Sequence, residues 1–262
     1  MQKALASSII ILSALIGVGV FLYPIILPAS SLITGPQTGD FQQTQALTMV
    51  LLTLTIGVLL LEVQGQATSA KMVAALGLLI AATSVLRFLE VAIPGPGGFS
   101  PIFVPIIIAG YVFGARFGFL MGALTMFVSA LLTGGIGPWL PYQMFTTGWV
   151  GLTAGLLPQL KNPYAQLAML AVFAFVWGIL YGFIMNLYYW PFLSGGVTEG
   201  LQSAQGVGTT LVNYGAFYLT TSFIWDLTRA TGNMILMLAL GLPAVRALQR
   251  FRDRFQFQVV TR

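Results

Sequence analysis

The sequence contains no cysteine and no histidine, and only 6% of its 262 residues are charged. These absences exclude disulfides, thiolate and imidazole metal sites, and every catalytic device that uses either side chain. The six acidic residues are dispersed, and no GxxxxGK[ST] phosphate-binding loop is present. We therefore expect no catalytic residues, no metal site and no cofactor, and we do not expect an enzyme.

Apolar residues are abundant instead, and they make up 57% of the chain. Because soluble domains carry roughly 25% charged residues, lipid rather than water is the expected solvent for most of this surface. Apolar stretches of about 20 residues recur, each long enough to cross a hydrocarbon core of about 30 Å. The sequence predicts an all-α, polytopic transmembrane helical bundle with eight spans, at 4–27, 44–63, 70–90, 101–114, 117–133, 142–159, 164–190 and 222–245.

The distribution of Lys and Arg predicts the orientation of the bundle. With a cytoplasmic N-terminus, the external connections 28–43, 91–100, 134–141 and 191–221 contain no basic residue. Cytoplasmic segments then hold Lys3, Lys71, Arg116, Lys161, Arg246, Arg250, Arg252, Arg254 and Arg262. This pattern obeys the positive-inside rule and predicts a multi-pass protein with both termini in the cytoplasm. The basic residues are scattered over helix ends, so nucleic acid is not an expected partner.

Two charged pairs fall inside the predicted spans. Arg87 and Glu90 are three residues apart, as are Asp226 and Arg229. A charged side chain at membrane depth costs on the order of 3 kcal/mol, so such residues usually face a partner or a water-filled cavity. Three-residue spacing places each acid beside its base on one helix face. The pairs are therefore either structural ion pairs or the border of an external pocket.

Amides and aromatic residues gather at the same outer end of the predicted spans. Single Trp and Tyr residues are expected there as interfacial belts, but a pocket combines apolar walls with a few polar groups. The candidate binding residues are Arg87, Glu90, Phe99, Trp139, Tyr142, Gln143, Tyr188, Tyr189, Asn213, Tyr214, Asp226, Arg229 and Asn233.

Small residues form faces on several spans. In the third span, intervals of three and four residues align Ala70, Ala74, Gly77, Ala81 and Ser84 in one stripe. Such a stripe allows close approach of another helix, from the same bundle or from a docking partner. Glycine pairs in later spans are expected to pack within the bundle: Gly110 and Gly114, Gly118 and Gly122, and Gly151 and Gly155.

Three motifs, in order, carry a resemblance to a known family. They are Pro101-Ile102-Phe103-Val104-Pro105 followed by Gly110 to Gly114, the stretch from Gly137 to Gly151, and Asp226 to Asn233 before a basic tail. From about residue 70 to 254 the chain resembles the substrate-binding membrane subunits, or S components, of energy-coupling factor (ECF) vitamin transporters. Six predicted spans match the six-helix core of that family.

The resemblance implies a binding subunit without enzymatic activity, located in a prokaryotic plasma membrane. It further implies that residues 91–100 form a lid and that Ala70, Ala74, Gly77 and Ala81 contact a transmembrane coupling subunit, which two ATPase subunits energise. The stretch from Gly137 to Met144 most resembles subunits assigned to cobalamin. Alternative cargoes are riboflavin or another planar vitamin, and a small acid such as pantothenate.

The expected organisation has three parts: two additional N-terminal spans in 1–63, the binding core in 64–254, and a cytoplasmic tail in 255–262. The role of the two extra spans stays open. Two other classes of function also stay open at this point, a self-sufficient secondary transporter or channel and a structural subunit of a membrane assembly.

Overall fold

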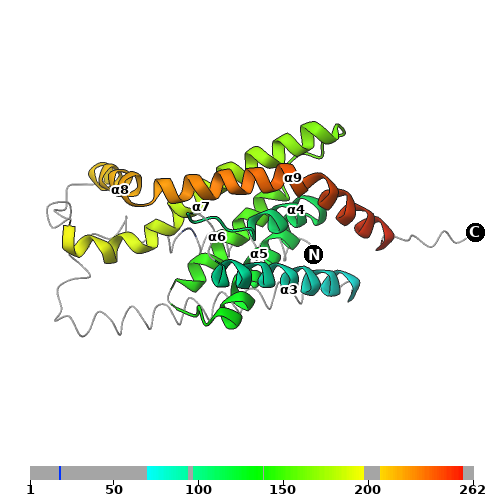
Figure 1. The fold of residues 1–262 in the computed structure, drawn as a ribbon, viewed down its shortest axis with the longest axis horizontal. Helices are drawn as coiled ribbons and strands as arrows, with labels where there is room; N and C mark the ends of the chain where they lie inside the picture. Colours follow the sequence, from blue (N-terminus) through cyan, green and yellow to red (C-terminus); the bar gives the residue numbers. More distant parts are fainter. Residues whose placement is uncertain (1–17, 19–69, 94–96, 138, 198–206, 256–262) are drawn as a thin grey trace, which may run out of the picture.

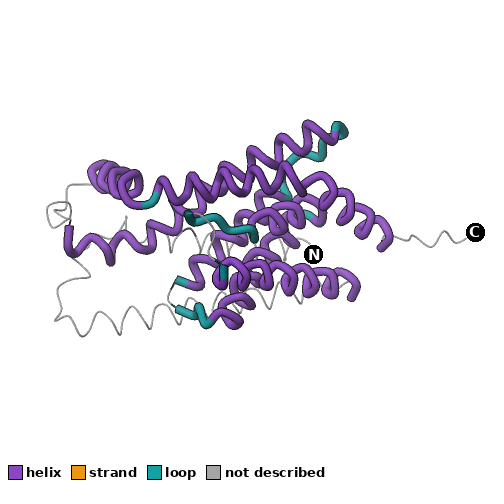
Figure 2. Tube along the Cα trace, viewed as in Figure 1, coloured by secondary structure: helices purple, strands orange, loops and turns teal. Residues whose placement is uncertain are grey.

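The computed structural model describes residue 18 and residues 70–93, 97–137, 139–197 and 207–255. These residues form seven α-helices and no strand (Figures 1 and 2). The helices are α3 (Ala70–Ala92), α4 (Phe103–Phe113), α5 (Ala115–Thr133), α6 (Leu140–Ala154), α7 (Pro163–Val197), α8 (Val207–Thr221) and α9 (Phe223–Phe255). The prediction of an all-α membrane bundle is confirmed for this part of the chain.

Six of the eight predicted spans have counterparts in these helices, namely α3, α4, α5, α6, α7 and α9. The predicted spans at 4–27 and 44–63 lie outside the described residues. By length and apolar composition, α3, α5, α7 and α9 can each cross a membrane. Helices α4 and α6 have only 11 and 15 residues, fewer than the roughly 20 that a single crossing requires.

Two boundaries differ from the prediction. Helix α6 ends at Ala154 rather than near 159, because Pro158 disfavours helical backbone in the residue before it. The predicted connection 191–221 is also partly helical, since α7 continues to Val197 and α8 begins at Val207. Helix α8 lies near one end of the molecule, close to the C-terminal part of α7 (Figure 1).

Helices α4, α5 and α6 approach one another through glycine. A Cβ on Gly110 or on Gly118 would overlap the carbonyl of Gly151, and a Cβ on Gly122 would overlap the carbonyl of Thr147. Helix backbones that lie this close make direct dispersion contacts, which larger side chains would prevent. The expected role of these glycines in internal packing is therefore seen. Gly114 differs, because it has no such contact and its φ of 99° allows the turn between α4 and α5.

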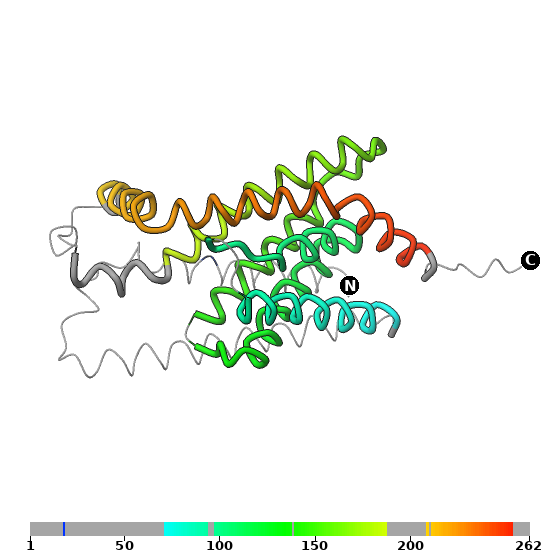
Figure 3. The backbone as a smooth tube through the Cα atoms, viewed as in Figure 1, coloured from blue at the N-terminus to red at the C-terminus, as the bar shows by residue number. Residues whose placement is uncertain are grey.

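Helices α7 and α9 form a second close pair (Figure 1). Gly178 faces Ala230, and Gly182 faces the carboxylate of Asp226. These two contacts set the antiparallel register of the pair. Helix α9 bends between its orange and red parts (Figure 3), and a proline inside the helix, Pro243, accounts for a bend because it removes a backbone donor.

The glycine contacts predict which substitutions the fold tolerates. We expect Gly151→Ala to lower the stability of the bundle by about 1–3 kcal/mol, because the added methyl group overlaps the backbone of Gly118. Gly77→Ala is the matched control, since nothing lies within 4 Å of a Cβ at Gly77. Thermal unfolding in detergent measures both variants. Equal midpoints for the two would contradict the close packing of α5 against α6.

Candidate functional site

A cavity of about 310 Å³ lies where α3 ends and α9 begins. Its walls come from α3, α4, α6, α7, α9 and the connection between α3 and α4. The lining residues are Arg87, Glu90, Gly97, Gly98, Phe99, Ser100, Ile102, Phe103, Gln143, Tyr181 and Arg229. Aromatic and aliphatic walls with a few convergent polar groups are typical of small-molecule sites, whose volumes are about 300–1,000 Å³.

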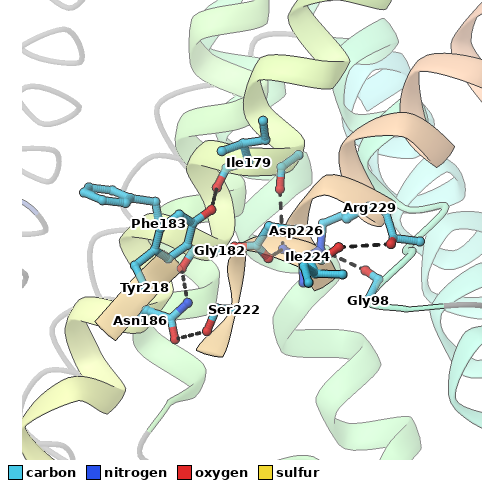
Figure 4. A network of polar contacts seen from close by, with 12 residues as sticks. Gly98, Ile179, Gly182, Phe183, Asn186, Tyr218, Ser222, Ile224, Asp226 and Arg229 are labelled. Carbon is cyan, nitrogen blue, oxygen red and sulfur yellow. Dashed lines mark hydrogen bonds and ion pairs between the residues drawn. The ribbon is translucent and has the colours of Figure 1, made fainter. Parts of the chain in front are cut away.

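Two polar contacts attach the connection between α3 and α4 to the helices around it. Arg229 donates from Nε to the carbonyl oxygen of Gly98 at 2.9 Å (Figure 4). Ser100 donates from Oγ to the carboxylate of Glu90 at 2.6 Å. These bonds hold Gly98 against α9 and Ser100 against α3 at the cavity.

Glycine lets this connection lie directly on α9. Gly97 has a φ of 54° and rests against the side chain of Thr228. The ring of Phe99 lies on Gly232, where a Cβ would overlap it. The left-handed backbone favours glycine at position 97, and the overlap with Phe99 disfavours any side chain at position 232.

Arg229 is the most fully paired charged residue that lines the cavity. Its guanidinium forms an ion pair with Asp226, lies 3.5 Å from the carbonyl oxygen of Gly178, and has its Cζ 5.4 Å from the ring centroid of Tyr181. The side chains of Arg229 and Asp226 are only 15% and 4% exposed. A desolvated guanidinium needs such partners, since an unpaired buried charge is strongly destabilising.

Arg87 and Glu90 form a looser pair, 3.6 Å apart, with side chains 22% and 20% exposed. Arg87 therefore holds fewer of its donors in place than Arg229 does. Of the two guanidinium groups that line the cavity, that of Arg87 therefore has more N–H donors available to bond an incoming molecule.

Polar contacts continue from this site along the α7 and α9 pair (Figure 4). Ser222 donates to the side-chain Oδ1 of Asn186, and the Nδ2 of Asn186 donates to the carbonyl of Gly182. Tyr218 of α8 donates to the carbonyl of Ile179. Burial raises the pKa of the Tyr218 phenol above its ordinary value, so the hydroxyl stays protonated and remains a donor.

Five of the predicted binding residues line the cavity together: Arg87, Glu90, Phe99, Gln143 and Arg229. Asp226 reaches the cavity only through its ion pair with Arg229.

The other predicted residues whose side chains the structure describes are not among those that line it. Trp139 donates to the carbonyl of Gly135, and Tyr142 packs against the core. Asn213 and Tyr214 lie in α8, where Tyr214 donates to the carbonyl of Phe183. Asn233 is fully buried in α9, and the side chains of Tyr188 and Tyr189 lie outside the described part of the structure.

Sequence reasoning also missed residues that line the cavity. The largest are Phe103 and Tyr181, whose ring centroids are 4.8 Å apart in an edge-to-face contact. Aromatic residues at the outer end of the seventh span, such as Tyr188, seemed closer to an external site. The cavity instead reaches about two helical turns further along α7, to Tyr181. The one available signal was the position of Tyr181 within a mostly apolar stretch of the span.

An apolar groove of about 650 Å³ lies on the other side of Phe99, along α9. Its lining residues are Phe99, Leu227, Thr228, Thr231, Gly232, Ile235, Leu236 and Ala239. Both threonine hydroxyls donate to carbonyls of their own helix. The groove therefore offers no polar group comparable to those of the cavity, and Phe99 separates the two.

The pairing of Arg229 predicts a double-mutant result. Arg229→Met leaves the carboxylate of Asp226 buried without its partner, so we expect a loss of stability of about 3–5 kcal/mol. Adding Asp226→Asn removes the charge and should restore part of the loss. Thermal unfolding of the single and double variants measures this effect. A double variant no more stable than Arg229→Met would contradict the pairing.

Residues 71–241 match the family described as the substrate-specific component of the ECF transporter. Comparisons with curated proteins and with solved structures gave no significant match. The matched region contains α4 to α8 entirely, nearly all of α3, the first half of α9 and every residue that lines the cavity. The chain belongs to the family of ECF transporter substrate-specific components, membrane subunits that bind the substrate of an importer.

Proposed function

We propose that this chain is the high-affinity vitamin-binding subunit of an ATP-driven ECF importer, and that it holds its cargo in the cavity around Arg87 and Arg229. The observation that carries the proposal is the convergence of charged, amide and aromatic side chains from five helices on one cavity. No group of three or more metal-binding side chains occurs among the described residues.

The distribution of basic residues supports an outward orientation of this cavity. Lys71 begins α3, Arg116 lies in the first turn of α5 and Lys161 precedes α7. Arg246, Arg250 and Arg252 lie in the last turns of α9. All six lie at helix ends opposite the cavity, and the positive-inside rule assigns that side to the cytoplasm.

Two observations bear on the cargo. The stretch from Gly137 to Met144, which favours cobalamin, contributes Gln143 to the cavity. A volume of about 310 Å³ is at the lower end of the range for small-molecule sites. A corrinoid therefore requires the connection that contains Gly98 to move away from Arg229, whereas riboflavin or pantothenate requires less opening. Cobalamin is the leading cargo by sequence, and a smaller vitamin is the alternative favoured by volume.

A vitamin panel tests the proposal. We expect one of cobalamin, riboflavin and pantothenate to bind the detergent-purified protein below micromolar concentration, measured with radiolabelled vitamin. Arg87→Gln should weaken that binding at least tenfold, about 1.4 kcal/mol, because it removes the less restrained guanidinium of the cavity. Lys71→Gln is the control, since Lys71 lies at the other end of α3.

Equal affinity of Arg87→Gln and Lys71→Gln would place the site elsewhere. Sustained accumulation of the vitamin in vesicles that contain this chain alone would contradict the importer-subunit proposal and favour a secondary transporter.

We further propose that α3 docks on the transmembrane coupling subunit, which the two ATPase subunits energise. Ala74, Gly77 and Ala81 are exposed on one face of α3, and nothing lies within 4 Å of a Cβ at Gly77. Ala70 begins the helix, but its side chain is outside the described part. Ser84, the next residue of the stripe, is buried, so the exposed part of the stripe ends at Ala81. A small exposed face lets a partner helix approach closely in lipid.

A substitution on this face should separate binding from transport. We expect Ala81→Leu to leave vitamin affinity unchanged and to lower uptake at least tenfold in cells that also express the coupling and ATPase subunits. Ala168→Leu, on an exposed position of α7, is the matched control and should retain uptake. Normal uptake by Ala81→Leu, or a parallel loss in the control, would contradict docking through this face.

A further inference from the structure

Asn233 has an unusual environment for an amide. It is 0% exposed, and neither its Oδ1 nor its Nδ2 has a hydrogen-bond partner among the residues that the structure describes. A buried polar group without a partner costs about 1–3 kcal/mol, and such groups are rare in native proteins. Thr146, which is also 0% exposed, avoids this cost by donating to the carbonyl of Tyr142. The amide of Asn233 therefore needs an explanation.

The position of Asn233 relates it to the cavity. It follows Arg229 by four residues, so the two side chains lie on one face of α9, separated by one helical turn or about 6 Å. The same face contains Ala230 and Met237, which are both fully buried. Because Gly178 faces Ala230 in the antiparallel pair, Asn233 lies level with the next turn of α7, around Ala174. Asn233 thus lies one layer deeper in the bundle than the cavity.

Two aromatic side chains line the cavity from the helices that pack against α9. Phe103 and Tyr181 line the cavity and contact each other edge to face. Neither ring carries a charge, and Tyr181 also lies beside the guanidinium of Arg229.

We infer that Asn233 is the innermost cargo-binding residue, and that it hydrogen-bonds a carboxamide, imide or amide group at the deep end of the bound vitamin. This inference rests on the proposed function. The side-chain amide has two donors beside an acceptor, so it matches a group that also presents a donor beside an acceptor. A site built in this way discriminates strongly against analogues that lack the matching group, because its own buried amide then stays unpaired.

The test uses two substitutions that remove the amide, one to a larger apolar side chain and one to a smaller. Asn233→Leu should unfold at an equal or higher temperature than the wild type, because it replaces an unpaired buried amide by an apolar group. Its dissociation constant for whichever of cobalamin, riboflavin and pantothenate the wild type binds should rise at least tenfold. Asn233→Ala introduces a smaller side chain that cannot overpack the site. It should show the same loss of affinity, which separates loss of the amide from a disturbance of packing by Leu.

Thr125→Val is the matched control. Thr125 of α5 is also 0% exposed, and its hydroxyl also lacks a partner among the described residues, but Thr125 does not line the cavity. We expect Thr125→Val to keep the wild-type affinity. Wild-type affinity in a folded Asn233→Leu or Asn233→Ala variant would overturn the inference and leave the proposed function standing. A wild type that binds none of the three vitamins would overturn the proposed function, and the inference with it.

Discussion

The buried guanidinium of Arg229 is the constraint around which the binding end of this protein is organised. Arg229 pairs with Asp226 of its own helix, and it also contacts the carbonyl of Gly178 on α7 and that of Gly98 in the connection between α3 and α4. One side chain therefore joins three segments that are far apart in the sequence. Since a desolvated charge is costly without partners, loss of any one contact weakens the arrangement of the others.

This network needs close backbone contacts, which glycine provides. Gly182 leaves room for the carboxylate of Asp226 beside α7, and Gly98 lies where a side chain would overlap the guanidinium of Arg229. On the other side of the molecule, Gly118 and Gly151 bring α5 and α6 into backbone contact. The glycine-packed helices α4, α5 and α6 support the cavity from one side. The α7 and α9 pair closes it from the other.

The sequence predicted the helical bundle because its dominant signal, long apolar stretches without charge, depends on composition alone. It also identified Arg87, Glu90 and Arg229, since charged residues inside a span are rare enough to be noticed singly. It did not identify Tyr181 or Phe103, because aromatic residues are common in every apolar span and only the packing of α4 against α7 brings these two together. Helix α8 was missed because Val207–Thr221 is too short and too polar to resemble a span.

The central claim is that cargo binds between Arg87, Gln143 and Arg229 on the polar side of Phe99. An experimental structure of the purified protein with its bound vitamin tests this claim most directly. The account predicts that the vitamin contacts these three residues and that its deep end lies near Asn233. A vitamin bound in the apolar groove beside Ile235 and Ala239, with the cavity around Arg229 still closed, would contradict it.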